Sequence, residues 1–251
     1  MRQLAIKAAK EAGRILINNL GKVNAVKEKS LSNFVTNVDL AAEKKIFSII
    51  RKKYPSFSIL SEEAGFIDKN SDYKWVIDPL DGTHNYMHSL PIFGTSIALE
   101  YKEDVKLGVI YLPMLNQLFV AEKGKGAFLN GKRIKVSGIK ELKDSLLLFE
   151  GSLHLHWEEK RKFLDKVNNK VFRVRISGAA CFDLTSLAQG SCDLHIGFAT
   201  NPWDVAAGFL LIREAGGKIT DFNGNAVDHY CRSFVASNSK LHNKILELIK
   251  S

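Results

Sequence analysis

The sequence has only three cysteines among its 251 residues and no apolar run long enough to cross a bilayer. Cys181, Cys192 and Cys231 are widely spaced and odd in number, so we expect reduced thiols and neither a disulfide framework nor a zinc site. Four charged residues between positions 7 and 14 interrupt any apolar core of a secretory signal. We therefore expect a cytoplasmic protein without membrane segments.

Internal repeats, low-complexity tracts and Pro/Gly-rich linkers are also absent from the sequence. Hydrophobic residues make up 45% of the chain and charged residues 25%, which is typical of a globular protein. A chain of this length can bury an ample core. These features predict that residues 1–251 form a single domain.

Positive charge is concentrated near the N-terminus. The net charge is +9, and residues 1–53 contain twelve Lys or Arg against four Asp or Glu. Such a segment is either a solvated, lysine-rich helix face or a surface that attracts nucleic acid or another anionic partner. Charge alone does not decide between these two interpretations.

Periodicity and turn residues predict a mixture of helices and strands. Helical spacing of apolar residues predicts helices over 3–19, 39–53, 158–168, 182–189, 204–215 and 241–250. Strands are expected over 57–60, 75–77, 93–101, 105–112, 118–122, 127–129, 133–136, 146–149, 171–176, 218–222 and 234–236. Asn130 and Gly131 predict a hairpin turn. The run of consecutive strands in the middle favours layered α/β packing with a substantial antiparallel sheet.

The segment most informative about chemistry spans residues 75–83 and reads WVIDPLDGT. A buried strand would end at Asp78, Pro79 would turn the chain, and Asp81 would return a second carboxylate close by. Two carboxylates held close together repel each other unless a cation or a proton intervenes. Hard oxygen ligands favour Mg²⁺, Mn²⁺ or Ca²⁺, although the same spacing is equally consistent with an ordinary Asx turn.

Three further acids are expected at the ends of predicted elements. Glu62 follows the strand 57–60, and Asp39 and Asp204 lie at helix starts. Each helix-start acid alone is explained by the helix dipole. Taken together with Asp78 and Asp81, these acids are compatible with one oxygen-rich centre.

Several motifs resemble those of the inositol monophosphatase family, and together they cover nearly the whole chain. The two most specific are DPLDGTHN at 78–85 and WDVAAG at 203–208, in the family's order and about 120 residues apart. Weaker matches are VTNVD at 35–39, the Glu62-Glu63 pair, GVIY at 108–111 and KGKGAFLNG at 123–131.

The resemblance implies a layered αβαβα fold of the inositol monophosphatase and fructose-1,6-bisphosphatase type, a homodimer, lithium sensitivity and two or three Mg²⁺ ions. The implied metal ligands are Glu62, Asp78, Asp81, Asp204 and the Leu80 carbonyl. The implied catalytic residues are Asp39, Thr83 and Glu62. The implied substrate contacts are Glu62, Leu80, Asp81, Gly82, Thr83, Gly178, Ala179, Ala180 and Asp204.

The implied reaction is Mg²⁺-dependent hydrolysis of inositol 1-phosphate or a similar small phosphate monoester by metal-activated water. The alternatives within the fold are a nucleotide 3′-phosphatase, a fructose-1,6-bisphosphatase or a histidinol-phosphatase. A different alternative is a binding role in an RNA or transcription complex through the basic N-terminal third.

Two positions depart from the family pattern. Asn33 stands where many members have an acid, which would weaken one metal site. Gly197 stands where members that act on inositol phosphate have a glutamate that binds a sugar hydroxyl. We expect this glycine to open space in the site and to flatten substrate selectivity.

Overall fold

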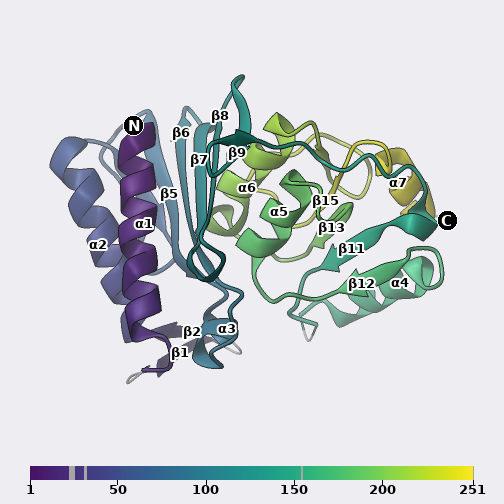
Figure 1. The fold of residues 1–251 in the computed structure, drawn as a ribbon, viewed down its shortest axis with the longest axis horizontal. Helices are drawn as coiled ribbons and strands as arrows, with labels where there is room; N and C mark the ends of the chain where they lie inside the picture. Colours follow the sequence, from purple (N-terminus) through teal and green to yellow (C-terminus); the bar gives the residue numbers. More distant parts are fainter. Residues whose placement is uncertain (23–25, 31–32, 154, 251) are drawn as a thin grey trace.

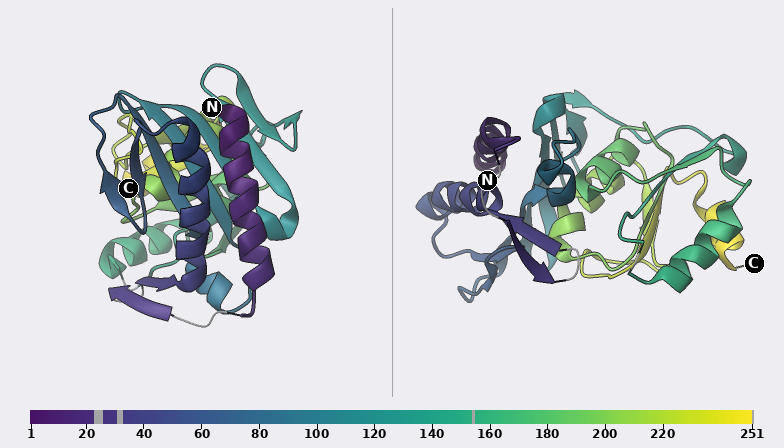
Figure 2. Two further views of the ribbon diagram at one scale, coloured as in Figure 1. Left: turned by 90° about the vertical axis from the view of Figure 1, so that its left-hand side faces the viewer. Right: turned by 90° about the horizontal axis from the view of Figure 1, so that it is seen from below.

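The computed structural model describes residues 1–22, 26–30, 33–153 and 155–250, and in it the chain stacks helices and sheets in five alternating layers (Figure 1). The same layering is visible from below in Figure 2. The helices of the three helical layers pair as α1 (Arg2–Asn19) with α2 (Asn37–Lys53), α5 (Ala180–Ala188) with α6 (Pro202–Glu214), and α4 (Trp157–Val167) with α7 (His242–Lys250). Within the described ranges, no helix is both long and apolar enough to cross a membrane.

The larger sheet has eight strands in the order β10-β9-β8-β7-β6-β5-β3-β4. Their bounds are β3 (Ser58–Ser61), β4 (Gly65–Ile67), β5 (Tyr73–Asp81), β6 (Gly94–Tyr101), β7 (Asp104–Leu112), β8 (Gln117–Glu122), β9 (Gly126–Leu129) and β10 (Lys132–Arg133). The neighbours pair antiparallel except β3 and β5, which are parallel. The predicted hairpin is confirmed, because Asn130 and Gly131 join β9 to β10 with φ values of 48° and 82°.

The smaller sheet has five strands in the order β12-β11-β13-β15-β14. Their bounds are β11 (Leu146–Phe149), β12 (Arg173–Arg175), β13 (Leu194–Gly197), β14 (Lys218–Thr220) and β15 (Phe234–Ser237). The remaining elements are the hairpin of β1 (Val26–Ser30) and β2 (Asn33–Thr36), the short helix α3 (Thr83–Met87), and two 3₁₀ turns at Pro113–Leu115 and Leu142–Asp144.

Three apolar cores lie between these layers. On α1, alanines at helical spacing face the larger sheet and let the helix approach it closely: Ala5, Ala8, Ala9 and Ala12 are fully buried, as is the larger Leu16. The middle layer is covered by a sheet on each side, which explains why α6 is buried at every position from Val205 to Ile212. The third core joins the smaller sheet to α4 and α7.

The predicted helices are confirmed to within a few residues at each end, and so are most of the predicted strands. The expectation that the strand over 75–77 ends at Asp78 is wrong. β5 continues through Pro79 to Asp81, and its register with β6 shifts between Asp78 and Asp81. The strands β1, β2, β4 and β13 and the helix α3 were not predicted.

The packing of α6 on the larger sheet depends on Gly108, because a Cβ there would lie 2.7 Å from the carbonyl oxygen of Ala207. We expect Gly108→Val to lower the free energy of unfolding by about 1–3 kcal/mol, the usual cost of overpacking. Urea unfolding followed by circular dichroism measures this change. The matched control is Gly138→Val, since a Cβ at Gly138 meets nothing within 4 Å. Equal stability of the two variants would contradict this packing.

Candidate active site

Two of the predicted site acids lie at the ends of neighbouring parallel strands, at the same edge of the larger sheet. β3 and β5 pair so that Ser61 lies opposite Ile77. The next residue on each strand is therefore an acid, Glu62 on one and Asp78 on the other. The N–H of Glu62 still donates to the carbonyl of Ile77, at 3.2 Å, so the two strand ends stay together.

The register shift in β5 adds a third acid at this edge. Beyond Asp78 the strand bulges and rejoins β6 at Asp81. The N–H of Leu80 donates to Asp78 Oδ1 at 3.0 Å, which fixes the first carboxylate inside the bulge. Gly82 follows with φ +87°, and a Cβ there would lie 2.9 Å from the carbonyl oxygen of Ile92. This turn therefore requires glycine.

Asp39 and Asp204 are held by the same local device, a capping box at a helix N-terminus. Asp39 is the third residue of α2 and accepts from the Thr36 N–H at 3.0 Å and from the Thr36 hydroxyl. Asp204 is the third residue of α6 and accepts from the Asn201 N–H at 2.7 Å. Each helix start therefore presents a carboxylate in a fixed position.

The predicted pair of Thr83 and Asp39 is brought together from segments 44 residues apart. Thr83 Oγ1 lies 3.3 Å from Asp39 Oδ1 and 3.0 Å from the Leu80 carbonyl oxygen, so its single proton is shared between two acceptors. Asp39 is fully buried. Its two oxygens are thus oriented by hydroxyls on both sides.

The turn before α5 packs against the same site. Gly178 has φ +78°, and its neighbour Ala179 lies 3.1 Å from the Cβ position of Gly82. The N–H groups of Ala180 and Cys181 donate to the two oxygens of Asp81, at 3.2 and 2.6 Å. The start of α5 is therefore bonded to Asp81, a contact that sequence reasoning missed.

Electrostatics show that these carboxylates share one poorly solvated space. Burial raises the pKa of Asp78 well above its usual value, and the charges of Glu62, Asp81, Asp204 and Asp39 raise it further, in that order. Burial likewise raises the pKa of Asp81 and of Asp39, and it outweighs the hydrogen bonds to each carboxylate, which lower the pKa. It raises the pKa of Asp204 to about 8, with smaller contributions from the charges of Asp81 and Glu62. Such a group is stabilised by a proton or by a cation.

The donor set fits a hard divalent cation, since the five side chains offer carboxylate oxygens. The Leu80 carbonyl lies nearby, because it shares the Thr83 hydroxyl with Asp39. As the side chains stand, however, no three acidic, histidine or cysteine side chains in the described part of the chain converge tightly enough to grip one ion. Asp78, Asp81 and Asp204 each accept a hydrogen bond from a nearby backbone N–H.

The two departures from the family pattern have different outcomes. Asn33 begins β2, but its side chain lies outside the described residues. At Gly197 the expectation of open space is wrong, because Gly197 pairs with Phe234 across the sheet and a Cβ there would lie 2.3 Å from the Phe234 ring. The family glutamate could enter only if this ring moved.

This five-layer fold, with acids at the strand ends of its larger sheet and at two helix starts, is the fold of the inositol monophosphatase and fructose-1,6-bisphosphatase type. The chain belongs to the inositol monophosphatase family, whose family model matches residues 1–251. The resemblance seen in the sequence is thereby confirmed, and it supports a phosphatase.

Named relatives span almost the whole chain. A fructose-1,6-bisphosphatase/inositol-1-monophosphatase of Thermotoga maritima is 35% identical over 98% of this chain and 94% of its own. The Nus factor SuhB of Escherichia coli K12 is 39% identical over 96% and 92%. The crystal structure of the extragenic suppressor protein suhB from Bartonella henselae matches with a TM-score of 0.96 and 35% identity, covering 99% of this chain and 98% of that one.

The raised pKa of Asp204 predicts a pH-dependent stability for the protein in EDTA. The folded state holds this proton more tightly than the unfolded chain, so the free energy of unfolding falls as the pH rises from about 4 to about 8. Asp204→Asn keeps an oxygen for the Asn201 N–H but removes the charge. Because the side chain is partly exposed, we expect the variant to be more stable than wild type by roughly 1–3 kcal/mol at pH 8 and equal to it below pH 4.

Urea unfolding at several pH values measures the difference, with Asp144→Asn as the control at an exposed acid. A gap between Asp204→Asn and wild type that did not change with pH would show that charge is not its cause.

Proposed function

We propose that this protein is a divalent-cation-dependent phosphatase that hydrolyses small phosphate monoesters, with Mg²⁺ as the cation. The observation that carries the proposal is the gathering of Glu62, Asp78, Asp81, Asp204 and Asp39 in one space, where burial and mutual repulsion raise the pKa of Asp78. A site of this kind repels an anionic substrate until cations neutralise it. Metal ions and substrate are therefore expected to bind together.

Bound divalent cations supply two effects, a lowered pKa for a coordinated water and neutralisation of charge on the phosphoryl oxygens. The chain itself supplies orientation and a proton acceptor. Thr83 Oγ1 bridges the Leu80 carbonyl and Asp39, so it can hold a water at this point and pass its proton towards Asp39. Thr36 holds the other oxygen of Asp39, which keeps the acceptor correctly aimed.

The substrate is proposed to lie against Gly82, Thr83 and the turn 178–180. These segments are in contact, since the Cβ position of Gly82 lies 3.1 Å from Ala179. The family is named for inositol monophosphate, and the Thermotoga maritima relative is named for both inositol 1-monophosphate and fructose 1,6-bisphosphate. Gly197 offers no hydrogen-bonding side chain to a sugar hydroxyl. We therefore propose a phosphatase of broad selectivity.

A second candidate role is binding within a transcription complex. Its support is the similarity to Nus factor SuhB together with the exposed basic residues on the outer helical layer, which include Lys7, Lys10 and Arg14 on α1 and Lys44 and Arg51 on α2. The family resemblance also implies a homodimer, which stays a prediction.

Asp81→Asn tests the proposed function directly. Removing this charge weakens cation binding, so we expect Mg²⁺-dependent turnover of a phosphomonoester to fall by at least about a hundredfold, or roughly 3 kcal/mol of transition-state stabilisation. Asparagine keeps one acceptor oxygen, for the closer N–H of Cys181, and loses the acceptor for the N–H of Ala180, a local change that should leave far-UV circular dichroism unchanged. The control is Asp144→Asn. Turnover at near wild-type rates in Asp81→Asn would refute the site, whereas a binding role would survive the substitution.

Thr83→Ala separates water activation from substrate binding. The hydroxyl acts on the attacking water, an interaction made chiefly in the transition state, so kcat should fall by about 10²–10⁴ while KM changes little. Thr83→Ser restores the hydroxyl and should restore most of kcat. Steady-state kinetics decide the matter: a rise in KM alone would make Thr83 a substrate-binding residue.

Selectivity is tested by a panel of phosphomonoesters with Mg²⁺. We expect inositol 1-phosphate, glycerol 2-phosphate and nucleoside 2′-phosphates to have kcat/KM values within about a hundredfold, because one missing hydrogen bond to a charged group is worth roughly 1.5–3 kcal/mol. A preference above about ten-thousandfold for any one of them would require over 5 kcal/mol from contacts elsewhere and would overturn broad selectivity.

A further inference from the structure

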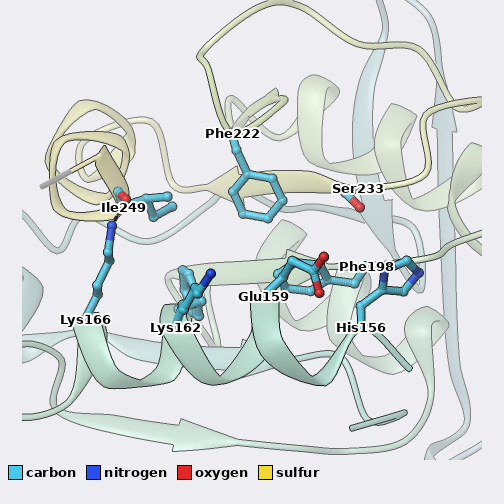
Figure 3. A pocket seen from close by; sticks show the side chains of 9 residues that line it. His156, Glu159, Lys162, Lys166, Phe198, Phe222, Ser233 and Ile249 are labelled. Atoms are coloured by element: carbon cyan, nitrogen blue, oxygen red, sulfur yellow. Dashed lines mark hydrogen bonds between the residues drawn. The ribbon is translucent and has the colours of Figure 1, made fainter. Parts of the chain in front are cut away.

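A cavity of about 410 Å³ lies in the outermost layer, between α4 and α7 and over the edge of the smaller sheet (Figure 3). This is the size range of small-molecule sites. None of its lining residues belongs to the acidic site. They are His156, Glu159, Lys162, Phe163, Lys166, Phe198, Phe222, Ser233 and Ile249.

One face of α4 supplies the polar side of this cavity. His156, Glu159, Phe163 and Lys166 recur at helical spacing, with Lys162 beside them. Figure 3 shows the side chains of Glu159, Lys162 and Lys166 rising from the helix towards Phe222 and the end of α7. The helix therefore presents a row of charged groups over an aromatic floor.

The floor is aromatic and held in place. Phe163 and Phe198 are 4% and 8% exposed, and the ring centroids of Phe198 and Phe222 are 5.2 Å apart. Beneath them Lys160 is fully buried, forms an ion pair with Glu150 and lies 5.6 Å from the centre of the Phe198 ring. Because Lys160 and Glu150 hold each other in place below the Phe198 ring, the floor is pre-formed, and ligand binding costs little conformational entropy.

The charges favour an anion at one end. Lys162 is exposed and, among the residues described, has neither an ion-pair nor a hydrogen-bond partner. Lys166, one turn further along, donates to the carbonyl of Ile249. Glu159 is the single acid in the lining; it lies one helical turn from Lys162 and two turns from Lys166, towards His156. The end of the cavity near α7 therefore has two cations above an apolar floor.

We propose that this cavity is a binding site for a small aromatic anion, distinct from the phosphatase site. The ring of the ligand stacks on Phe198 and Phe222, and its carboxylate pairs with Lys162 and Lys166. Aromatic stacking supplies contact area, and the lysines fix the orientation of the ligand. An uncharged ligand of the same shape gains the stacking but not the ion pairs.

The test is isothermal titration of the full chain with 2-naphthoate, in EDTA so that the acidic site offers no cation to an anion. We expect one saturable site with a dissociation constant below about 1 mM, and binding of the neutral 2-naphthamide at least about tenfold weaker, the equivalent of 1.4 kcal/mol. Absence of saturable binding, or equal affinity for the amide, would overturn the proposal.

Variants locate the site. Lys162→Glu reverses one charge at an exposed position and should weaken the binding of 2-naphthoate by about tenfold or more. Lys170→Glu makes the same charge change at an exposed residue outside the cavity and should have no effect. Ile249→Trp, at a half-buried position, should block the cavity by bulk without altering the lysines. Binding that is indifferent to both Lys162→Glu and Ile249→Trp, or equally sensitive to Lys170→Glu, would place the ligand elsewhere.

Discussion

Mutual repulsion among five acids, which come from strand ends of the larger sheet and from two helix starts, is the constraint on which this structure depends. Asp78 experiences the charges of Glu62, Asp81, Asp204 and Asp39 in addition to its own burial. Uncompensated, such a cluster would push apart the elements that carry it. The chain opposes this by giving N–H donors to the acids: Leu80 to Asp78, α5 to Asp81, and the caps of α2 and α6 to Asp39 and Asp204.

Much of the fold could be predicted from the sequence, because the strongest patterns coincide with the most buried elements. The alanine-rich face of α1 and the apolar run of α6 are periodic over several turns, and Asn130-Gly131 is a local hairpin signal. β13 escaped prediction because its four residues include His195 and Gly197 and become a strand only between β11 and β15. The bulge of β5 was missed because Pro79 suggests a turn, whereas the neighbouring strand β6 keeps it extended.

For the candidate site, the sequence indicated which acids gather but not how they are held. The capping boxes of α2 and α6 were readable, since Thr36-x-x-Asp39 and Asn201-x-x-Asp204 share one pattern. The sequence did not reveal the hydrogen bonds from α5 to Asp81 or the ring of Phe234 over Gly197, because each contact joins residues far apart in the chain. Such contacts depend on the stacking of whole layers.

The capping boxes fix the starts of α2 and α6 through the chain's own hydrogen bonds. In small zinc domains the metal supplies the folding energy, so loss of the ion unfolds the chain. Here one oxygen of Asp204 already completes the start of α6, and Asp39 does the same for α2. The scaffold is thus set before any ion arrives. On the proposed function, a bound cation would relieve the repulsion among the acids and so raise the free energy of unfolding, whereas its release would leave both helix starts capped.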